Sequence, residues 1–212
     1  MQYGILGSGM VGQALASKLV QGGHSVMIGT RDASKLADWA QGAGVQVGSF
    51  EQTAQFGQVL INALSGFAVL DTFQSLSSDA VQDKIVIDIA NPLDFSQGMP
   101  PTLFVSNTDS LGEQLQRAVP SLRVVKTLNS VTADLMVNPR QLADGEHDLF
   151  MCGNDADAKA QVTRLLREEF GWKHITDLGD ISHARATEML LPIWIRLYGK
   201  LGTAHFSLRV VQ

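Results

Sequence analysis

Three glycines near the start of the chain, at positions 7, 9 and 12, constrain its fold more than any other feature. They follow a short apolar run, and the spacing Gly-x-Gly-x-x-Gly between a strand and a helix is typical of the Rossmann-type α/β fold. We expect Gly7 to make the tight turn out of the strand, Gly9 to let a pyrophosphate approach the backbone, and Gly12 to let the helix pack closely on the sheet. The N-terminus of that helix offers unpaired N–H groups and a partial positive charge, which suit phosphate.

The segment after the glycines carries a helical pattern, which argues against a chance match in a chain with 20 glycines. Gly22 and Gly23 provide a suitable C-terminal stop for this helix. The apolar residues that recur at helical spacing are Met10, Val11, Ala14, Leu15 and Leu19.

The exit of the expected second strand, at Gly29-Thr30-Arg31, predicts NADP in preference to NAD. An NAD site usually carries an acid there, which accepts a hydrogen bond from the ribose, and a carboxylate would repel a 2′-phosphate. A guanidinium pairs with that phosphate, so we assign this role to Arg31, with the hydroxyl of Thr30 beside it. Lys35 lies one helical turn further on, and Asp32 is well placed to cap the next helix.

Composition excludes several classes of protein. A 212-residue chain with 45% hydrophobic and 17% charged residues is globular, and its net charge of −5 with no basic run argues against nucleic acid as a partner. Cys152 is the single cysteine, which excludes a disulfide framework and a thiolate metal cage. The chain opens directly into a strand and its apolar stretches are too short to span a bilayer, so we expect a cytoplasmic protein without a membrane partner.

Strand and helix patterns alternate along the first part of the chain, which predicts a doubly wound, mainly parallel sheet of the Rossmann type. We expect one NADP-binding domain over 1–212, with a core over about 1–130 and a short α+β extension over about 131–212 packed on it. Helices are expected at 34–41, 69–76 and 110–118. The expected core strands are 3–6, 25–28, 45–47, 58–64, 84–90 and 123–128.

The extension is expected to add strands at 148–152 and 174–178, a helix over 158–170, and a strand at 206–211. The segment 180–201 reads as helical, with a kink at Pro192. Its second half has almost no polar face, and a helix that is apolar all round is buried on most sides. Two compatible interpretations follow: a core helix that closes the domain, or a homodimer formed through 181–201.

Five segments of the chain resemble the NADP-dependent reductases typified by the NADPH–coenzyme F-420 oxidoreductases. The same segments are similar to the cytosolic reductase domain of the six-transmembrane ferric and cupric reductases. The resemblance covers nearly the whole chain. Its carriers are residues 7–12, 29–31, 88–92 (Asp-Ile-Ala-Asn-Pro), 125–130 (Val-Lys-Thr-Leu-Asn-Ser) and 151–154 (Met-Cys-Gly-Asn).

The resemblance implies a role for each position that matches the family. It assigns the pyrophosphate to backbone N–H groups, the 2′-phosphate to the exit of the second strand, and the adenosine half to the end of the fourth strand. In that order, the residues are Ser8, Gly9, Met10 and Val11; Thr30, Arg31 and Lys35; and Ala63 and Leu64. Near the nicotinamide it places Ala90, Asn91 and Pro92, and at the border of the acceptor it places Asn129 and Ser130. The general rule that ligands lie beyond the carboxyl ends of parallel strands agrees with this assignment.

The implied reaction is hydride transfer between NADP(H) and a deazaflavin such as coenzyme F-420, or a flavin, as a small-molecule co-substrate. Such a transfer needs alignment of two rings more than acid–base help, so no catalytic side chain and no metal are assigned. Two alternatives stay open. One is an NADPH-dependent reductase of a small carbonyl or imine, which needs a proton donor; neither Tyr3 nor Tyr198 belongs to a Tyr-x-x-x-Lys motif. The other is an NADP-binding module that senses without catalysis.

Overall fold

The computed structural model describes residues 1–211 and contains one large sheet. The strands are β1 (Gln2–Leu6), β2 (Ser25–Gly29), β3 (Gln46–Gly48), β4 (Val59–Asn62), β5 (Ile85–Asp88), β6 (Leu93–Asp94), β7 (Thr102–Leu103), β8 (Arg123–Thr127), β9 (Asp148–Gly153) and β10 (His174–Asp177). The α-helices are α1 (Met10–Gln21), α2 (Ala37–Ala43), α3 (Phe50–Phe56), α4 (Val69–Gln74), α5 (Ser78–Val81), α6 (Leu111–Ala118), α7 (Ala133–Val137), α8 (Ala156–Leu165), α9 (Ala184–Met189) and α10 (Leu191–Leu201). Short turns of 3₁₀ or π type are η1 (Ala33–Leu36), η2 (Gly66–Ala68), η3 (Pro139–Gln141), η4 (Ala143–Gly145), η5 (Leu166–Phe170) and η6 (Ile181–His183).

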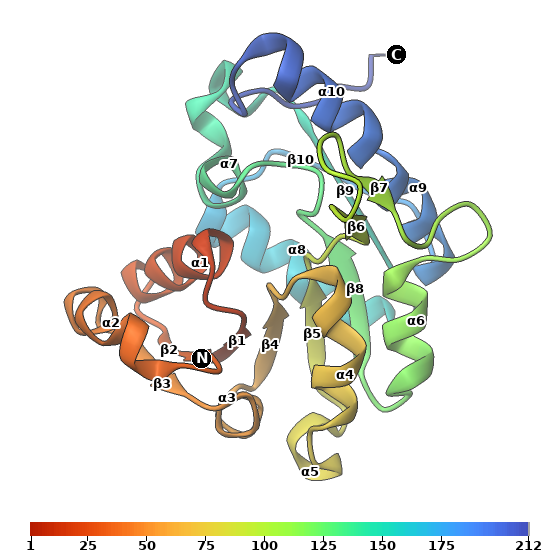
Figure 1. Ribbon diagram of the computed structural model, residues 1–212. Coiled ribbons are helices and arrows are strands. Elements are labelled where there is room, and N and C mark those ends of the chain that lie inside the picture. The colour runs from red at the N-terminus through yellow and green to blue at the C-terminus, as the bar shows by residue number, and fades with distance from the viewer. Residues whose placement is uncertain (212) are drawn as a thin grey trace.

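The eight strands of the sheet follow the order β10-β9-β8-β5-β4-β1-β2-β3. The six strands β8, β5, β4, β1, β2 and β3 are all parallel to their neighbours, which confirms the Rossmann-type doubly wound architecture (Figure 1). The extension continues the same sheet: β9 runs antiparallel to β8, and β10 is parallel to β9. Gly153 is required at the antiparallel junction, because a Cβ there would contact the Val124 carbonyl oxygen.

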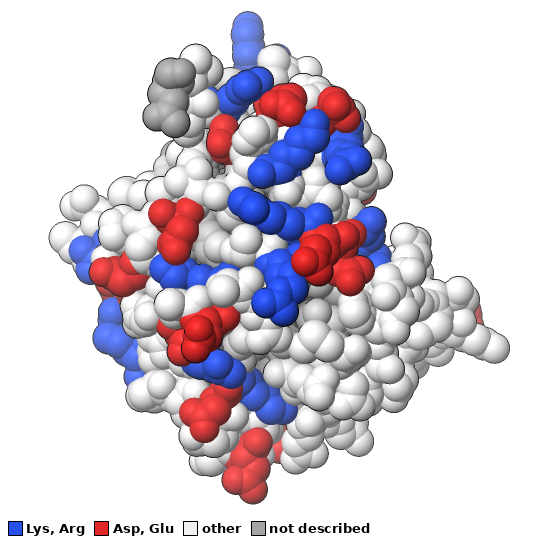
Figure 2. Space-filling view, turned by 180° about the vertical axis from the view of Figure 1, so that it is seen from behind, with Lys and Arg blue, Asp and Glu red and all other residues white. Residues whose placement is uncertain are grey.

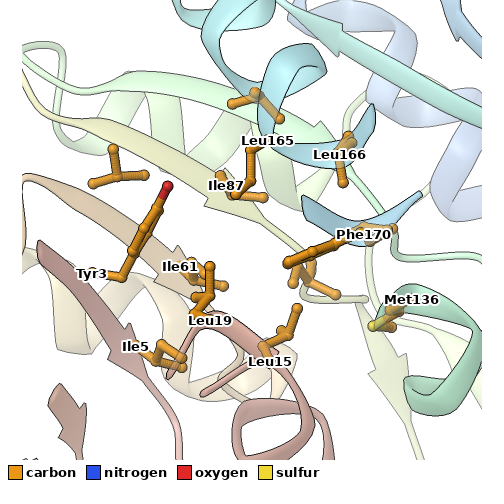
Figure 3. Packing of buried hydrophobic residues seen from close by; sticks show 14 of the residues in the cluster. Tyr3, Ile5, Leu15, Leu19, Ile61, Ile87, Met136, Leu165, Leu166 and Phe170 are labelled. Carbon is orange, nitrogen blue, oxygen red and sulfur yellow. The ribbon is translucent and has the colours of Figure 1, made fainter. Parts of the chain in front are cut away.

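The side chains of alternate residues along the strands pack in two separate hydrophobic cores, one on each face of the sheet. Ile85 and Ile87 point to the face covered by α1, α7 and α8, whereas Val86 points to the face covered by α3, α4 and α6. Figure 3 shows the first core, in which side chains of β1, β4 and β5 meet Leu15 of α1 and Leu165 of α8. Burial on both faces explains why the strands read as nearly continuous apolar runs.

One local prediction is wrong, and one helix was not predicted. Residues 206–211 do not form a strand, because their pairing with β9 amounts to a single backbone bond, in which the Asp148 N–H donates to the Leu208 carbonyl. The next rung is made by the Asp148 side chain, which accepts from the Val210 N–H. Helix α3 was not expected; it begins with a capping box in which Ser49 and Gln52 satisfy each other's backbone N–H groups.

The apolar segment near the C-terminus is split and largely exposed. Helix α9 ends at Met189 and α10 begins at Leu191, so Pro192 lies in a first turn, where its missing N–H costs nothing. The interpretation of α10 as a core helix is wrong: Ile193 is 51% exposed and Leu201 54%. The reason is its position, because α10 lies beyond the ends of the strands at the top of Figure 1 and not over a face of the sheet.

The surface shows mixed charge. On the face in Figure 2, Lys and Arg are interspersed with Asp and Glu and do not gather into a patch of one sign. Across residues 1–211, no helix is both long enough and apolar enough to cross a membrane.

Candidate functional site

The three glycines of the turn have different surroundings. Gly7 has φ 119°, and a Cβ there would collide with the Ala63 carbonyl that follows β4, so the turn and the close strand packing both need glycine. A Cβ at Gly12 would collide with the Gly7 carbonyl. At Gly9, in contrast, φ is −73° and a Cβ would meet no other atom within 4 Å. The fold therefore leaves open space at Gly9, directly before the N-terminus of α1, and that space suits a phosphate.

The exit of β2 presents an unpaired cation. Arg31 is exposed and makes no hydrogen bond or ion pair with any other residue in 1–211. The Thr30 hydroxyl lies 3.2 Å from the Ser8 hydroxyl, which donates to it and joins this loop to the glycine turn. Asp32 caps η1, as expected, and bonds from Ser34 lower the pKa of its carboxyl group. Lys35 Nζ lies 3.5 Å from Asp32 Oδ2, so its charge is partly matched.

A polar cavity of about 710 Å³ lies between the glycine turn, the exit of β2 and the loop after β4. The predicted coenzyme residues that line it are Gly7, Ser8, Gly9, Thr30, Arg31 and Lys35. Phe50 of α3 also lines this cavity, and no pattern in the sequence pointed to it, because α3 itself was not expected.

A second cavity, of about 670 Å³ and mostly apolar, lies beyond the ends of β4, β5 and β8. The predicted residues that line it are Met10, Val11, Ala90, Asn91 and Asn129. Ala63, Leu64 and Ser65, directly after β4, line both cavities, so the two form one continuous path. Its two ends are Arg31 and the pair Asn91–Asn129.

Three predicted residues lie beside the path without lining it. Gly12 packs against the Gly7 carbonyl, and Ser130 is buried. Pro92 is buried too, and its carbonyl accepts from the Phe104 N–H at 2.9 Å, which holds the start of the β6–β7 hairpin.

Aromatic residues on the rim of the apolar cavity were not predicted. Phe67 is 62% exposed and Phe95 55%, and both line the cavity. The ring of Phe67 stacks on Phe104 at a centroid distance of 4.4 Å. Extending the strand-end rule past Leu64 would have found Phe67. Trp194 of α10 forms the far wall, and no pattern near it in the sequence indicated this role.

Below the apolar cavity lies a buried polar rung. Asn62, Asp88 and Lys126 occupy the same register on β4, β5 and β8. Lys126 Nζ lies 2.9 Å from Asp88 Oδ2 and 2.8 Å from Glu188 Oε1 of α9, and it also donates to the Ala90 carbonyl. Burial disfavours a charge on Lys126, but the two carboxylates outweigh it and raise the pKa of this ammonium group.

The polar rung fixes the ends of three elements around the cavity. Glu188 accepts from the N–H groups of Leu111 and Gly112 at the start of α6, at 2.9 and 3.0 Å. Asp88 Oδ1 accepts from Asn62 Nδ2 at 2.7 Å. Because these groups bind one another, the loop from Ala90 to Pro92 starts from a rigid base.

Known proteins resemble this chain in sequence and in fold. Residues 2–92 match the family model described as NADP oxidoreductase, coenzyme F420-dependent. A crystal structure from Arthrobacter sp. FB24, described as a candidate F420-dependent NADP reductase, is 45% identical, covers 100% of this chain and 99% of its own, and superposes with a TM-score of 0.95.

Curated relatives point the same way. The F420-dependent NADP reductase of Methanothermobacter marburgensis is 26% identical over 100% of this chain and 99% of its own length. Metalloreductase STEAP3 of Rattus norvegicus is 30% identical over 91% of this chain, which spans 38% of the length of that relative. The chain belongs to the family of F420-dependent NADP oxidoreductases, and it is an NADP-dependent oxidoreductase.

Proposed function

We propose that this protein passes a hydride between NADP(H) and a deazaflavin of the coenzyme F-420 type. When bound, NADPH supplies the hydride from its dihydronicotinamide ring. The observation that carries the proposal is the continuous path from Arg31, past Gly9 and the residues after β4, to an apolar cavity beside Asn91. Its polar half suits the adenosine phosphate end of the coenzyme, and its apolar half suits two stacked rings.

In the polar half, each residue has a separable task. Arg31 has no protein partner among residues 1–211 and pairs with the 2′-phosphate, while Thr30 and Lys35 flank it. The open backbone at Gly9 and the first N–H groups of α1 receive the pyrophosphate. Ala63 and Leu64 lie where the path passes from one cavity to the other, so they contact the middle of the coenzyme.

In the apolar half, the walls align and exclude water. Phe67 and Phe95 present aromatic rings at the mouth, and Trp194 and Met136 supply apolar surface further in. Such walls hold a flat acceptor against the nicotinamide, and the residues need to bring the two reacting atoms to roughly 3–3.5 Å.

The same cavity gives little support to reduction of a small carbonyl or imine, which requires a proton donor. Among the described residues that line the apolar cavity, Asp94 is the only one with an ionisable side chain. A hydrogen bond from the Ser96 N–H lowers the pKa of Asp94, so this carboxyl group stays ionised at neutral pH and has no proton to give.

The decisive experiment measures NADPH oxidation with a panel of acceptors: coenzyme F-420, FMN, FAD, a set of ketones and cyclic imines, and ferric citrate. We expect turnover with the deazaflavin at least tenfold faster than with any other acceptor. Phe95→Ala should raise the KM for the deazaflavin and leave the Kd of NADPH unchanged, whereas Arg31→Ala should do the reverse. Turnover confined to carbonyls, imines or ferric ion would refute the proposed acceptor.

A further inference from the structure

Asn91 and Asn129 bind each other at the floor of the apolar cavity. Asn129 Nδ2 donates to Asn91 Oδ1 at 2.9 Å, and Asn91 Nδ2 donates to the backbone carbonyl of Asn129 at 2.8 Å. Asn129 Nδ2 gives its second hydrogen to the Thr187 carbonyl of α9 at 3.0 Å. The pair therefore ties the ends of β5 and β8 to the C-terminal helices.

These bonds also determine which end of each side-chain amide is nitrogen. A backbone carbonyl can only accept, so the atom that faces the Thr187 carbonyl must be the Asn129 nitrogen. By the same reasoning, the atom that faces the Asn129 carbonyl must be the nitrogen of Asn91. The free end of the Asn129 side chain is thus its carbonyl oxygen, Oδ1.

Asn129 Oδ1 has no partner within the described part of the chain. No donor in residues 1–211 bonds to it, although the residue is only 4% exposed. It is also absent from the set of fully buried polar atoms that lack a partner, so the small exposed part of Asn129 includes this oxygen. Because Asn129 lines the apolar cavity, Oδ1 faces that cavity. Asn91 Nδ2 keeps one hydrogen unused as well.

The backbone before Asn129 is strained. Leu128 has φ 63°, in the left-handed region that a leucine rarely adopts, and its side chain is buried. Strain of this kind persists where the surrounding contacts impose it, and it is common at ligand sites. Here it turns the chain sharply at the end of β8 and brings the Asn129 side chain back toward Asn91.

We infer that Asn129 Oδ1 accepts a hydrogen bond from the carboxamide N–H₂ of the nicotinamide, while the spare Asn91 N–H lies ready for the carboxamide oxygen. This inference rests on the proposed coenzyme path. An N–H beside a C=O also occurs on the pyrimidine edge of a deazaflavin. The coenzyme is the better match, because Asn91 follows β5, the neighbour of β4, whose end supplies the residues that both cavities share. Asn129 is then a specificity-determining residue that sets the rotation of the nicotinamide ring.

The test compares two ligands by titration calorimetry: NADP⁺ and its 3-acetylpyridine analogue, in which a methyl group replaces the amide NH₂. The wild-type protein should bind the analogue about tenfold more weakly, the effect of one lost hydrogen bond to a buried acceptor. Asn129→Ala should bind both ligands with equal Kd. Thr132→Val is the matched control, because Thr132 lines the same cavity and its hydroxyl makes no hydrogen bond within residues 1–211. This variant should keep the discrimination.

Either of two titration results would overturn this inference alone. Equal binding of the two ligands by wild type would do so without any variant, which covers the case in which Asn129→Ala fails to fold. Discrimination that persists in a folded Asn129→Ala would do so too. If discrimination persists, the KM of Asn129→Ala for the deazaflavin, measured in a separate turnover assay, tells whether Asn129 contacts the acceptor instead. The titration itself contains no acceptor, so its results leave the proposed acceptor unaffected; failure of wild type to bind NADP⁺ at all would overturn both proposals.

Discussion

Lys126 and Asp88 face each other on neighbouring parallel strands, with the ammonium 2.9 Å from the carboxylate and neither side chain exposed to solvent. Glu188 completes the group from the far end of the chain, 2.8 Å from the same ammonium. One cation thus compensates two buried carboxylates directly beneath the loop that carries Asn91.

Removal of the cation should be costly. Lys126→Met leaves two carboxylates buried without their partner, and we expect a loss of about 3–5 kcal/mol in the free energy of unfolding. Lys173→Met is the control, because Lys173 pairs with exposed acids at the surface, and it should cost about 1 kcal/mol or less. Urea unfolding of both variants measures the difference, and equal losses would show that the buried cluster has no special weight.

Gly9→Val should separate binding from folding. The added side chain meets open space in the protein, so the free energy of unfolding should change by no more than about 1 kcal/mol. The same side chain fills the place proposed for the pyrophosphate, and calorimetry should detect no NADP⁺ binding. Gly12→Val is the contrasting variant, because it collides with the Gly7 carbonyl and should lower the melting temperature strongly. Unchanged affinity in Gly9→Val would mean that the turn does not hold phosphate.

Arg31→Ala should weaken NADPH by roughly 10–100-fold, the value of a charge-assisted hydrogen bond to phosphate, and leave NADH nearly unchanged. Lys35→Ala should have a smaller effect, because Lys35 is highly exposed and already lies beside Asp32. Fluorescence titrations with both coenzymes make the comparison. If Arg31→Ala weakened NADPH and NADH binding equally, the assignment of Arg31 to the 2′-phosphate would be wrong.

The ion pair between Asp109 and Arg117 predicts a dependence of stability on pH. Hydrogen bonds from Arg117 lower the pKa of Asp109 to about 2 in the folded protein, below its value in the unfolded chain. Because the pKa of Asp109 is lower in the folded protein, its ion pair stabilises the fold at any pH above the pKa of Asp109 in the unfolded chain. This stabilisation is lost as the pH falls through the pKa of Asp109 in the folded protein. Because Arg117 is largely exposed, we expect Asp109→Asn to cost about 1 kcal/mol or less at pH 7. The difference from wild type should shrink between about pH 4 and pH 2; thermal unfolding across this range would contradict the assignment if the gap stayed constant.

We propose that two copies of the chain associate through α10. Ile193 and Leu201 of α10 expose 51% and 54% of their surface, and Met189, the last residue of α9, exposes 40%, an unusual amount for large apolar residues. Ile193→Lys should therefore shift the molecular mass measured by light scattering from dimer to monomer. Arg196→Lys, a change on the same helix that keeps the charge, is the control. A monomeric wild-type protein would refute the dimer.

Local patterns predicted the sheet because its strands are buried on both faces and each is followed by a helix. Strand β5 was readable from its apolar run alone, and Gly7, Gly9 and Gly12 identified the turn. The same logic failed for residues 206–211, where apolar composition suggested a strand but β9 offers just one backbone bond.

The part of the site that sequence patterns could not supply depends on long-range packing. Trp194 and Glu188 reach the cavity and the polar rung because α9 and α10 fold back over the ends of β5 and β8. Lys126 looked like an ordinary strand residue, and nothing local marks it as buried. The alignment of Asn62, Asp88 and Lys126 across three strands can be recognised only when the strand order is known.

The cavity proposed for the coenzyme phosphates is lined by residues from the first 72 of the chain, whereas part of the wall of the apolar cavity comes from Met136, Leu191 and Trp194. Only Ala63, Leu64 and Ser65 serve both among the described residues. The polar cavity therefore needs only the early part of the chain, whereas the apolar cavity combines early residues such as Met10 and Phe67 with the C-terminal helices. If the proposed acceptor site is correct, substitutions in the late helices change the preference for the electron acceptor over evolutionary time while the early segment keeps the same coenzyme.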